Sequence, residues 1–82
     1  MLIYIIFNED YESNAKSLRD AVKAEWSDSS INMMGTPRTL YQVQIDNEIV
    51  YSNNSVTDDD TIIDLIEERL EYETTYRTTN CR

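Results

Sequence analysis

LIYIIF, at residues 2–7, is a continuously apolar run of β-branched and aromatic side chains that ends at Asn8. The run is too short to span a membrane, and its lack of polar alternation predicts a strand that is buried on both faces. We therefore expect a central strand around which the other elements pack. Two amphipathic helical segments farther along the chain would cover its two faces, and a hairpin would extend the sheet.

The first helical segment follows this strand directly. Its apolar residues recur at intervals of three or four, which places them on one face of a helix. They are Tyr11, Ala15, Leu18, Val22 and Trp26. Lys16, Arg19 and Lys23 form a basic stripe on the polar side of the same helix. We interpret this stripe as a solvated surface, with a binding patch as the alternative.

The second helical segment lies near the C-terminus. Thr57 is its expected N-cap, and the acids of residues 58–60 suit the first turn because they face the positive end of the helix dipole. Its apolar stripe consists of Ile62, Ile63, Leu65, Ile66 and Leu70. We place the end of the domain at residue 73, so that residues 1–73 form one domain and residues 74–82 form a polar, flexible tail. A short added strand over residues 74–76 is the alternative for the tail.

Between the two helices the sequence predicts three more strands. Residues 31–34 are short enough for an edge strand, and Pro37 ends it because proline cannot donate to a strand ladder. Residues 40–45 alternate between apolar and polar side chains, and Asp46-Asn47 supplies the turn of a hairpin that returns through residues 49–51. We predict an α/β (α+β) fold of β-α-β-β-β-α order. Its four-stranded mixed sheet has the order 2-1-3-4, with a right-handed crossover through the first helix.

Composition excludes several classes of function. The chain has 82 residues, enough for one domain, and contains no His, one Cys (Cys81) and one Gly. An internal disulfide, a zinc cluster, a histidine base and a glycine-rich phosphate loop are therefore not available. The net charge of −9 opposes direct binding to nucleic acid or to anionic membranes. We expect a cytoplasmic protein without cofactor or metal, and we interpret the N-terminal run as structure and not as a signal peptide.

Short motifs resemble the thioredoxin-like superfamily. EDYESNAKSL, at residues 9–18, resembles the glutaredoxin active-site segment, but Glu9 and Glu12 stand where the two cysteines belong. Gly35-Thr36-Pro37 resembles the family's Thr-x-Pro segment, and residues 45–48 resemble its hairpin turn. The segment from 27 to 36 has no room for the further helix of glutaredoxins, so the compact selenoprotein W-like branch fits better. That alignment moves the redox pair to Asn8 and Tyr11.

The resemblance implies a binding groove and a cis Thr36–Pro37 peptide bond beside it. The residues that would line this partner-binding groove are Asn8, Glu9, Asp10, Tyr11, Thr36 and Pro37. Thiol-disulfide exchange needs activated sulfur at the start of the helix, and neither alignment leaves a cysteine there. Our first hypothesis is therefore a redox-inactive thioredoxin-like module that binds or regulates a protein partner. The packing of Tyr11 and Pro37 in the fold is the plainer interpretation of these residues.

Acidic residues on the second helix suggest another class of function. The acidic face consists of Asp60, Asp64, Glu67, Glu68 and Glu71. Such a face could imitate nucleic-acid phosphates and occupy a basic site on a DNA-binding partner, although acidic helix surfaces are most often only solvated. An enzyme that uses Glu9 and Glu12 as a carboxylate pair is a third and weaker hypothesis. We expect a monomer or weak homodimer that binds a protein partner, with a basic surface on that partner under the second hypothesis.

Overall fold

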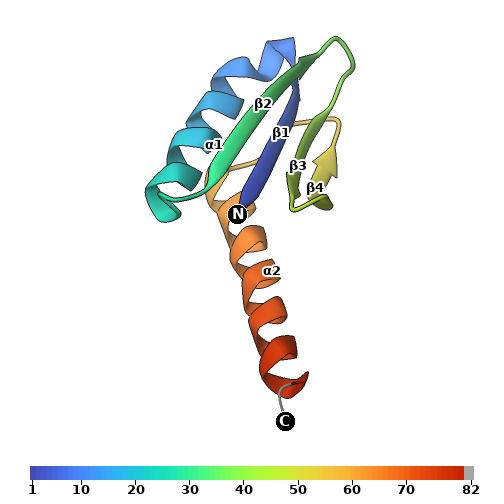
Figure 1. Cartoon of the computed structure of the whole chain (residues 1–82). Helices are drawn as coiled ribbons and strands as arrows, with labels where there is room; N and C mark the ends of the chain where they lie inside the picture. The colour runs from blue at the N-terminus through green and yellow to red at the C-terminus, as the bar shows by residue number, and fades with distance from the viewer. Residues whose placement is uncertain (81–82) are drawn as a thin grey trace.

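The computed structural model describes the backbone of residues 1–80 and the side chains of residues 1–70. In chain order the elements are β1 (Leu2–Asn8), the 3-10 turn η1 (Glu9–Tyr11), α1 (Glu12–Glu25), β2 (Ser30–Thr36), β3 (Tyr41–Ile45), β4 (Glu48–Asn53) and α2 (Asp59–Asn80). The sheet order is β2-β1-β3-β4; β1 and β2 are parallel and the other pairs are antiparallel (Figure 1). The predicted fold class and strand order are confirmed, and this topology agrees with a thioredoxin-like core.

The hydrophobic core lies between one face of the sheet and the two helices. Alternate residues of the two central strands face it, and the buried residues of both helices belong to the same cluster. The buried apolar side chains are Ile3, Ile5, Phe7, Ala15, Leu18, Val22, Tyr41, Val43, Ile45, Ile62 and Ile66. The stripe predicted for α1 and the apolar face predicted for β3 are therefore confirmed. The stripe predicted for α2 is confirmed except at Leu65, which is only partly buried and is not among the residues packed against this cluster.

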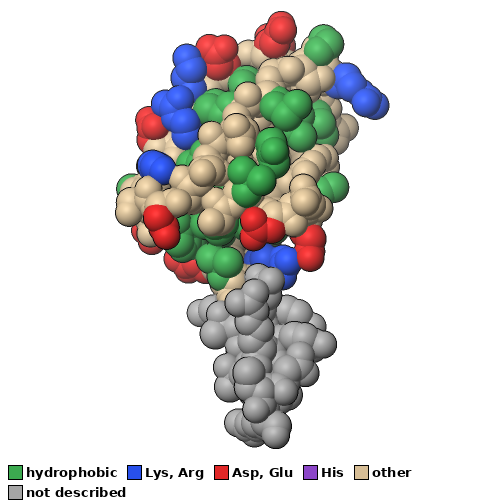
Figure 2. Space-filling model, viewed as in Figure 1, with side chains coloured by type: hydrophobic (Ala, Val, Ile, Leu, Met, Phe, Trp, Pro, Cys, Tyr) green, Lys and Arg blue, Asp and Glu red, His purple; other side chains and the backbone are tan. Residues whose placement is uncertain are grey.

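Strand β1 is central, but the prediction that both of its faces are buried is wrong. Its burial alternates along the strand, with Leu2, Tyr4 and Ile6 only partly buried on the side away from the helices. The two helices cover the same face of the sheet, so the other face is open, and Figure 2 shows hydrophobic side chains gathered on it. Cross-strand neighbours such as Met34 and Gln42, which both pair with Ile6, shield these side chains laterally.

The predicted hairpin is confirmed. Asp46 and Asn47 both have positive φ, 48° and 73°, as a two-residue type I′ turn requires, and Asn and Asp tolerate that region. The turn is also tied to the first strand. The Leu2 amide donates to Asp46 Oδ1 at 3.1 Å, and the Asp46 amide donates to the Leu2 carbonyl at 2.9 Å.

Helix α2 begins at Asp59, so the expected N-cap at Thr57 is wrong by one residue. The Asp58 carbonyl accepts the Ile62 amide at 3.3 Å, which places Asp58 at the cap position. The helix backbone continues to Asn80, which excludes the alternative of a strand over residues 74–76. The domain boundary at 73 stays a prediction, because the side chains from residue 71 onward lie outside the described residues. Among the described helices, none is long and apolar enough to cross a membrane.

Candidate functional site

Most of the predicted groove residues meet at the end of β1. Asn8 is the Cα partner of Thr36, and its side-chain amide donates to the carbonyls of Pro37 at 3.2 Å and Arg38 at 2.9 Å. Its side-chain oxygen accepts the Asp10 amide at 2.9 Å. Asn8 therefore joins β1, η1 and the loop after β2, and both the nitrogen and the oxygen of its side-chain amide are hydrogen-bonded.

Tyr11 is held by other elements. Its hydroxyl donates to the Asn54 carbonyl at 2.9 Å, and its ring meets the Tyr41 ring edge to face with centroids 6.2 Å apart. Tyr11 thus links η1 to β3 and to the segment after β4. These contacts favour the plainer interpretation of Tyr11 as a packing residue, whereas Glu9 and Asp10 are exposed at the rim.

The expected cis bond before Pro37 is wrong, since no peptide bond in the described chain is cis. A local hydrogen bond closes the bend instead: the Arg38 amide donates to Thr36 Oγ1 at 3.2 Å. Because a Ser or Thr side chain can stabilise a turn in this way, the chain reverses here with the commoner trans isomer. The groove hypothesis loses the geometric feature that the resemblance implied.

The acidic face of α2 is exposed where its side chains are described. Asp60, Asp64, Glu67 and Glu68 all lie in solvent, as predicted, and the side chain of Glu71 lies outside the described residues. Arg69 extends to β4, where its guanidinium contacts Glu48 at 2.7 Å. Arg69, the cation nearest to the acidic face on α2, is therefore directed toward Glu48 of β4.

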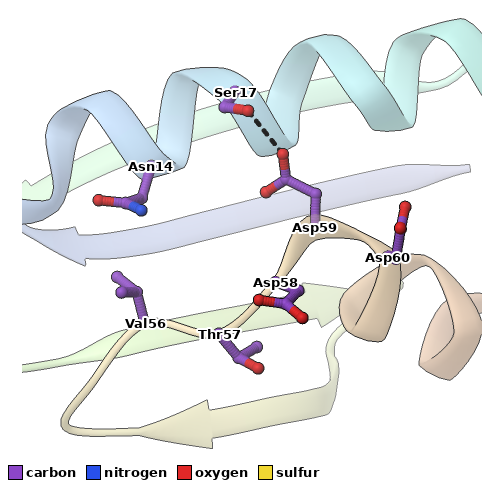
Figure 3. Close-up of a pocket in the computed structure, with 7 residues that line it drawn as sticks. All are labelled: Asn14, Ser17, Val56, Thr57, Asp58, Asp59 and Asp60. Atoms are coloured by element: carbon purple, nitrogen blue, oxygen red, sulfur yellow. Dashed lines mark hydrogen bonds between the residues drawn. The ribbon is translucent and has the colours of Figure 1, made fainter.

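A hollow of about 500 Å³ lies where the start of α2 meets α1 (Figure 3). Its lining consists of Asn14, Ser17, Val56, Thr57, Asp58, Asp59 and Asp60. Ser17 Oγ donates to Asp59 Oδ2 at 2.6 Å, which links the two helices. In the described residues no group of His, Cys, Asp and Glu side chains is arranged to hold a metal ion. The geometry here supports a structural joint between helices.

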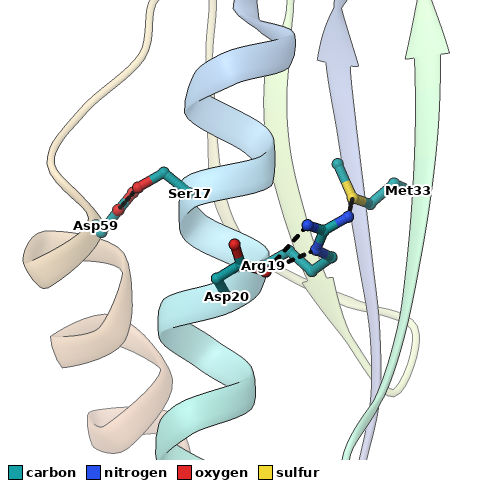
Figure 4. A network of polar contacts seen from close by, with 5 residues as sticks. All are labelled: Ser17, Arg19, Asp20, Met33 and Asp59. Atoms are coloured by element: carbon teal, nitrogen blue, oxygen red, sulfur yellow. Dashed lines mark hydrogen bonds and ion pairs between the residues drawn. The ribbon is translucent and has the colours of Figure 1, made fainter.

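Two residues of the predicted basic stripe on α1, Arg19 and Lys23, lie beside β2. Arg19 is paired with Asp20 at 3.0 Å and reaches across to the Met33 sulfur at 3.8 Å (Figure 4). Lys23 donates to the Ser29 carbonyl at 2.5 Å, and Lys16 pairs with Glu12 at 3.2 Å. The sequence indicated the stripe, but only the parallel pairing of β2 with β1 shows that it flanks an edge strand.

Tyr41 is a further feature that sequence patterns missed. The residue is fully buried, and its hydroxyl has no hydrogen-bond partner among the described residues. Burial raises the pKa of this hydroxyl to about 12, and the nearby Asp59 and Tyr51 contribute in the same direction. The apolar periodicity of β3 predicted a core position, but periodicity does not report whether a hydroxyl finds an acceptor.

Comparisons with known proteins do not assign this chain to a family. No model of a known protein family matches it, and no curated protein sequence matches it significantly.

Proposed function

We propose that this protein is a noncatalytic, redox-inactive module of thioredoxin-like type, related to the selenoprotein W-like branch, which acts in the cytoplasm by binding a protein partner. The observation that carries the proposal is the exposed acidic face of α2, with Asp60, Asp64, Glu67 and Glu68 all in solvent. The groove end of the sheet supports it less well, because Asn8 and Tyr11 are occupied by contacts within the fold.

Electrostatics favours a basic partner. Asp60, Asp64 and Glu68 follow one another at intervals of four residues, which corresponds to about 6 Å along a helix axis. Like charges at this spacing repel each other by a few tenths of a kcal/mol per pair. A basic surface would relieve this repulsion and would also accelerate association, and added salt would weaken both effects.

A charge-matched pair of variants tests this function. E67Q/E68Q removes two charges from the acidic face, whereas E25Q/D28N removes two exposed charges near the end of α1. Partners captured from the native host and identified by mass spectrometry would be measured against wild type and both variants at low and high salt. We expect salt-sensitive binding that E67Q/E68Q weakens and E25Q/D28N retains. Equal binding by both variants at all salt concentrations would refute the proposal.

A second candidate is a nucleic-acid mimic that occupies the basic site of a DNA-binding protein. The regular row of carboxylates on one side of α2 favours it, since phosphates also form a regular anionic row. This candidate requires that duplex DNA competes with the protein for the captured partner, and that the competition weakens for E67Q/E68Q. A partner that binds DNA and this protein simultaneously would exclude the mimic while leaving the protein-binding module intact.

A further inference from the structure

Strand β2 is an edge strand whose outer backbone groups face away from the sheet. The Ser30 amide donates to the Met1 carbonyl at 2.9 Å, so Ser30 directs its backbone groups toward β1. Because successive residues of a strand direct these groups to opposite sides, Ile31, Met33 and Gly35 direct theirs outward. Within the described chain, β2 pairs with β1 alone. Three amide donors and three carbonyl acceptors are thus directed to the free edge.

This edge lacks the features with which proteins protect edge strands. The sequence of β2, SINMMGT, has no charge and no proline, and Met34 is 50% exposed. By contrast, the opposite edge strand begins with Glu48, which is ion-paired, and its pairing with β3 contains an irregularity at Val43/Gln44. Charges and bulges of that kind discourage strand addition. The two edges therefore differ in their readiness to accept another strand.

The helix layer beside the β2 edge offers cations. Arg19 and Lys23 of α1, with Asp20, line a hollow of about 420 Å³ that Ser29, Ser30 and Ile31 complete. Asp20 balances one of the two positive charges by its contact with Arg19, so the hollow keeps an excess of one positive charge. On the other side of β2 lies the open face of the sheet, where Asn32 and Met34 are uncharged.

We propose that the free edge of β2 binds an extended acidic segment of a partner protein, which adds to the sheet as a fifth strand. Side chains of an added strand alternate between the two faces of the sheet. Those on the helix side would meet Arg19 and Lys23 and are therefore acidic, while those on the open side would continue the surface of Met34 and are therefore apolar. The recognised sequence alternates acidic and apolar residues. This surface is separate from the acidic face of α2.

Charge argues against a second copy of this chain as the occupant. A two-fold pairing of β2 with itself would bring Arg19 and Lys23 toward the same residues of the other copy. Like charges placed across an interface disfavour it, whereas an acidic segment complements the hollow.

A matched pair of substitutions at Gly35 tests the edge. G35P removes an outward amide and leaves the amides that face β1, and proline is tolerated in this orientation on edge strands. G35A keeps the amide, and its Cβ would lie 3.9 Å from the Phe7 ring, an ordinary contact. A random 12-residue peptide library would be selected on immobilised full-length wild type. We expect enriched peptides that alternate acidic and apolar residues and bind G35A like wild type but G35P at least tenfold more weakly.

Two further measurements use the same peptides and do not depend on G35P folding. Hydrogen exchange of the wild type should show that the amides of Ile31, Met33 and Gly35 become protected when a selected peptide is added. K23E should weaken the acidic peptides at least tenfold and strengthen versions in which Lys replaces their acids. An absence of enriched peptides, enrichment without the alternation, unprotected edge amides or indifference to K23E would each overturn the proposal.

Discussion

Replacing Tyr41 with Phe should stabilise the protein. The Tyr41 hydroxyl is buried and has no hydrogen-bond partner among the described residues. A buried polar group without a partner costs about 1–3 kcal/mol, and Phe keeps the ring and its edge-to-face contacts with Tyr11 and Tyr51. Allowing for the small void left by the oxygen, we expect Y41F to raise the free energy of unfolding by about 1 kcal/mol, which is about 4–8 °C in Tm for a domain of this size.

The same hydroxyl gives a signature at high pH. Its pKa is 10.0 in the reference state and about 12 in the folded protein, so folding favours the neutral form. Below pH 10 the hydroxyl is neutral in both the folded and the unfolded state, and its ionisation does not affect stability. As the pH rises from 10 toward 12 the unfolded state loses the proton first, so the free energy of unfolding falls. From the two pKa values the wild type should lose about 1 kcal/mol of its free energy of unfolding at pH 11 through this group. Y41F lacks the group, so its advantage over wild type should increase by about that amount between pH 8 and 11.

Urea unfolding followed by the fluorescence of Trp26, the one tryptophan, measures both effects. Y11F and Y51F are matched controls, because the Tyr11 hydroxyl donates to Asn54 at 2.9 Å and the Tyr51 hydroxyl donates to Ser55 at 3.1 Å. Each control substitution removes one hydrogen bond and should lower the free energy of unfolding by about 0.5–1.5 kcal/mol. A Y41F protein that is destabilised like the controls, or whose advantage over wild type does not change with pH, would refute the reasoning.

Two further substitutions test the ends of the sheet by urea unfolding. N8A removes the three hydrogen bonds of the Asn8 side chain and should lower the free energy of unfolding by about 1–3 kcal/mol. N8D keeps the bond from the Asp10 amide but turns a carboxylate oxygen, which cannot donate, toward the two carbonyls, so it should also be destabilising. An N8D protein as stable as wild type would show that the bonds to the carbonyls of Pro37 and Arg38 contribute nothing. N47A places a Cβ-bearing residue without a polar side chain at φ 73° and should cost about 1 kcal/mol, whereas N47G should be neutral or stabilising. An N47A protein as stable as N47G would contradict the positive φ of the turn.

Local sequence patterns predicted the helices and strands and their order along the chain, because helical spacing and strand alternation depend only on residues a few positions apart. The helical spacing of Ala15, Leu18 and Val22, and the alternation of Val43 and Ile45 in β3, both report which side faces the core. The apolar run at residues 2–7 wrongly predicted that both faces of β1 are buried, and the reason is physical. Apolar side chains on the outer face of a central strand are partly shielded by the strands on either side, so an unbroken run does not require a second covering layer.

The contacts of the candidate sites could not be predicted in this way, because they join residues far apart in the chain. The bonds from Asn8 to Pro37 and Arg38 span about thirty residues, and the approach of Arg19 to Met33 depends on the parallel pairing of β2. The isomer before Pro37 was inferred from a resemblance and was wrong, since a neighbouring threonine side chain closes the bend. The positions of the acids along the second helix, by contrast, correctly indicated that Asp60, Asp64, Glu67 and Glu68 would be exposed on α2.

The contacts of Asn8 and Tyr11 explain why we propose interaction surfaces away from the end of β1. In redox-active members of the families that the sequence resembles, this end of the sheet holds the reactive sulfur at the start of the helix. Here Asn8 binds the loop after β2 and Tyr11 packs on Tyr41, so changing either residue would cost stability before it altered binding. The exposed carboxylates of α2 and the outward amides of β2 do not hold other elements of the fold in place as Asn8 and Tyr11 do. Residues on such surfaces can change to suit a partner without destabilising the fold, and a binding module requires this freedom.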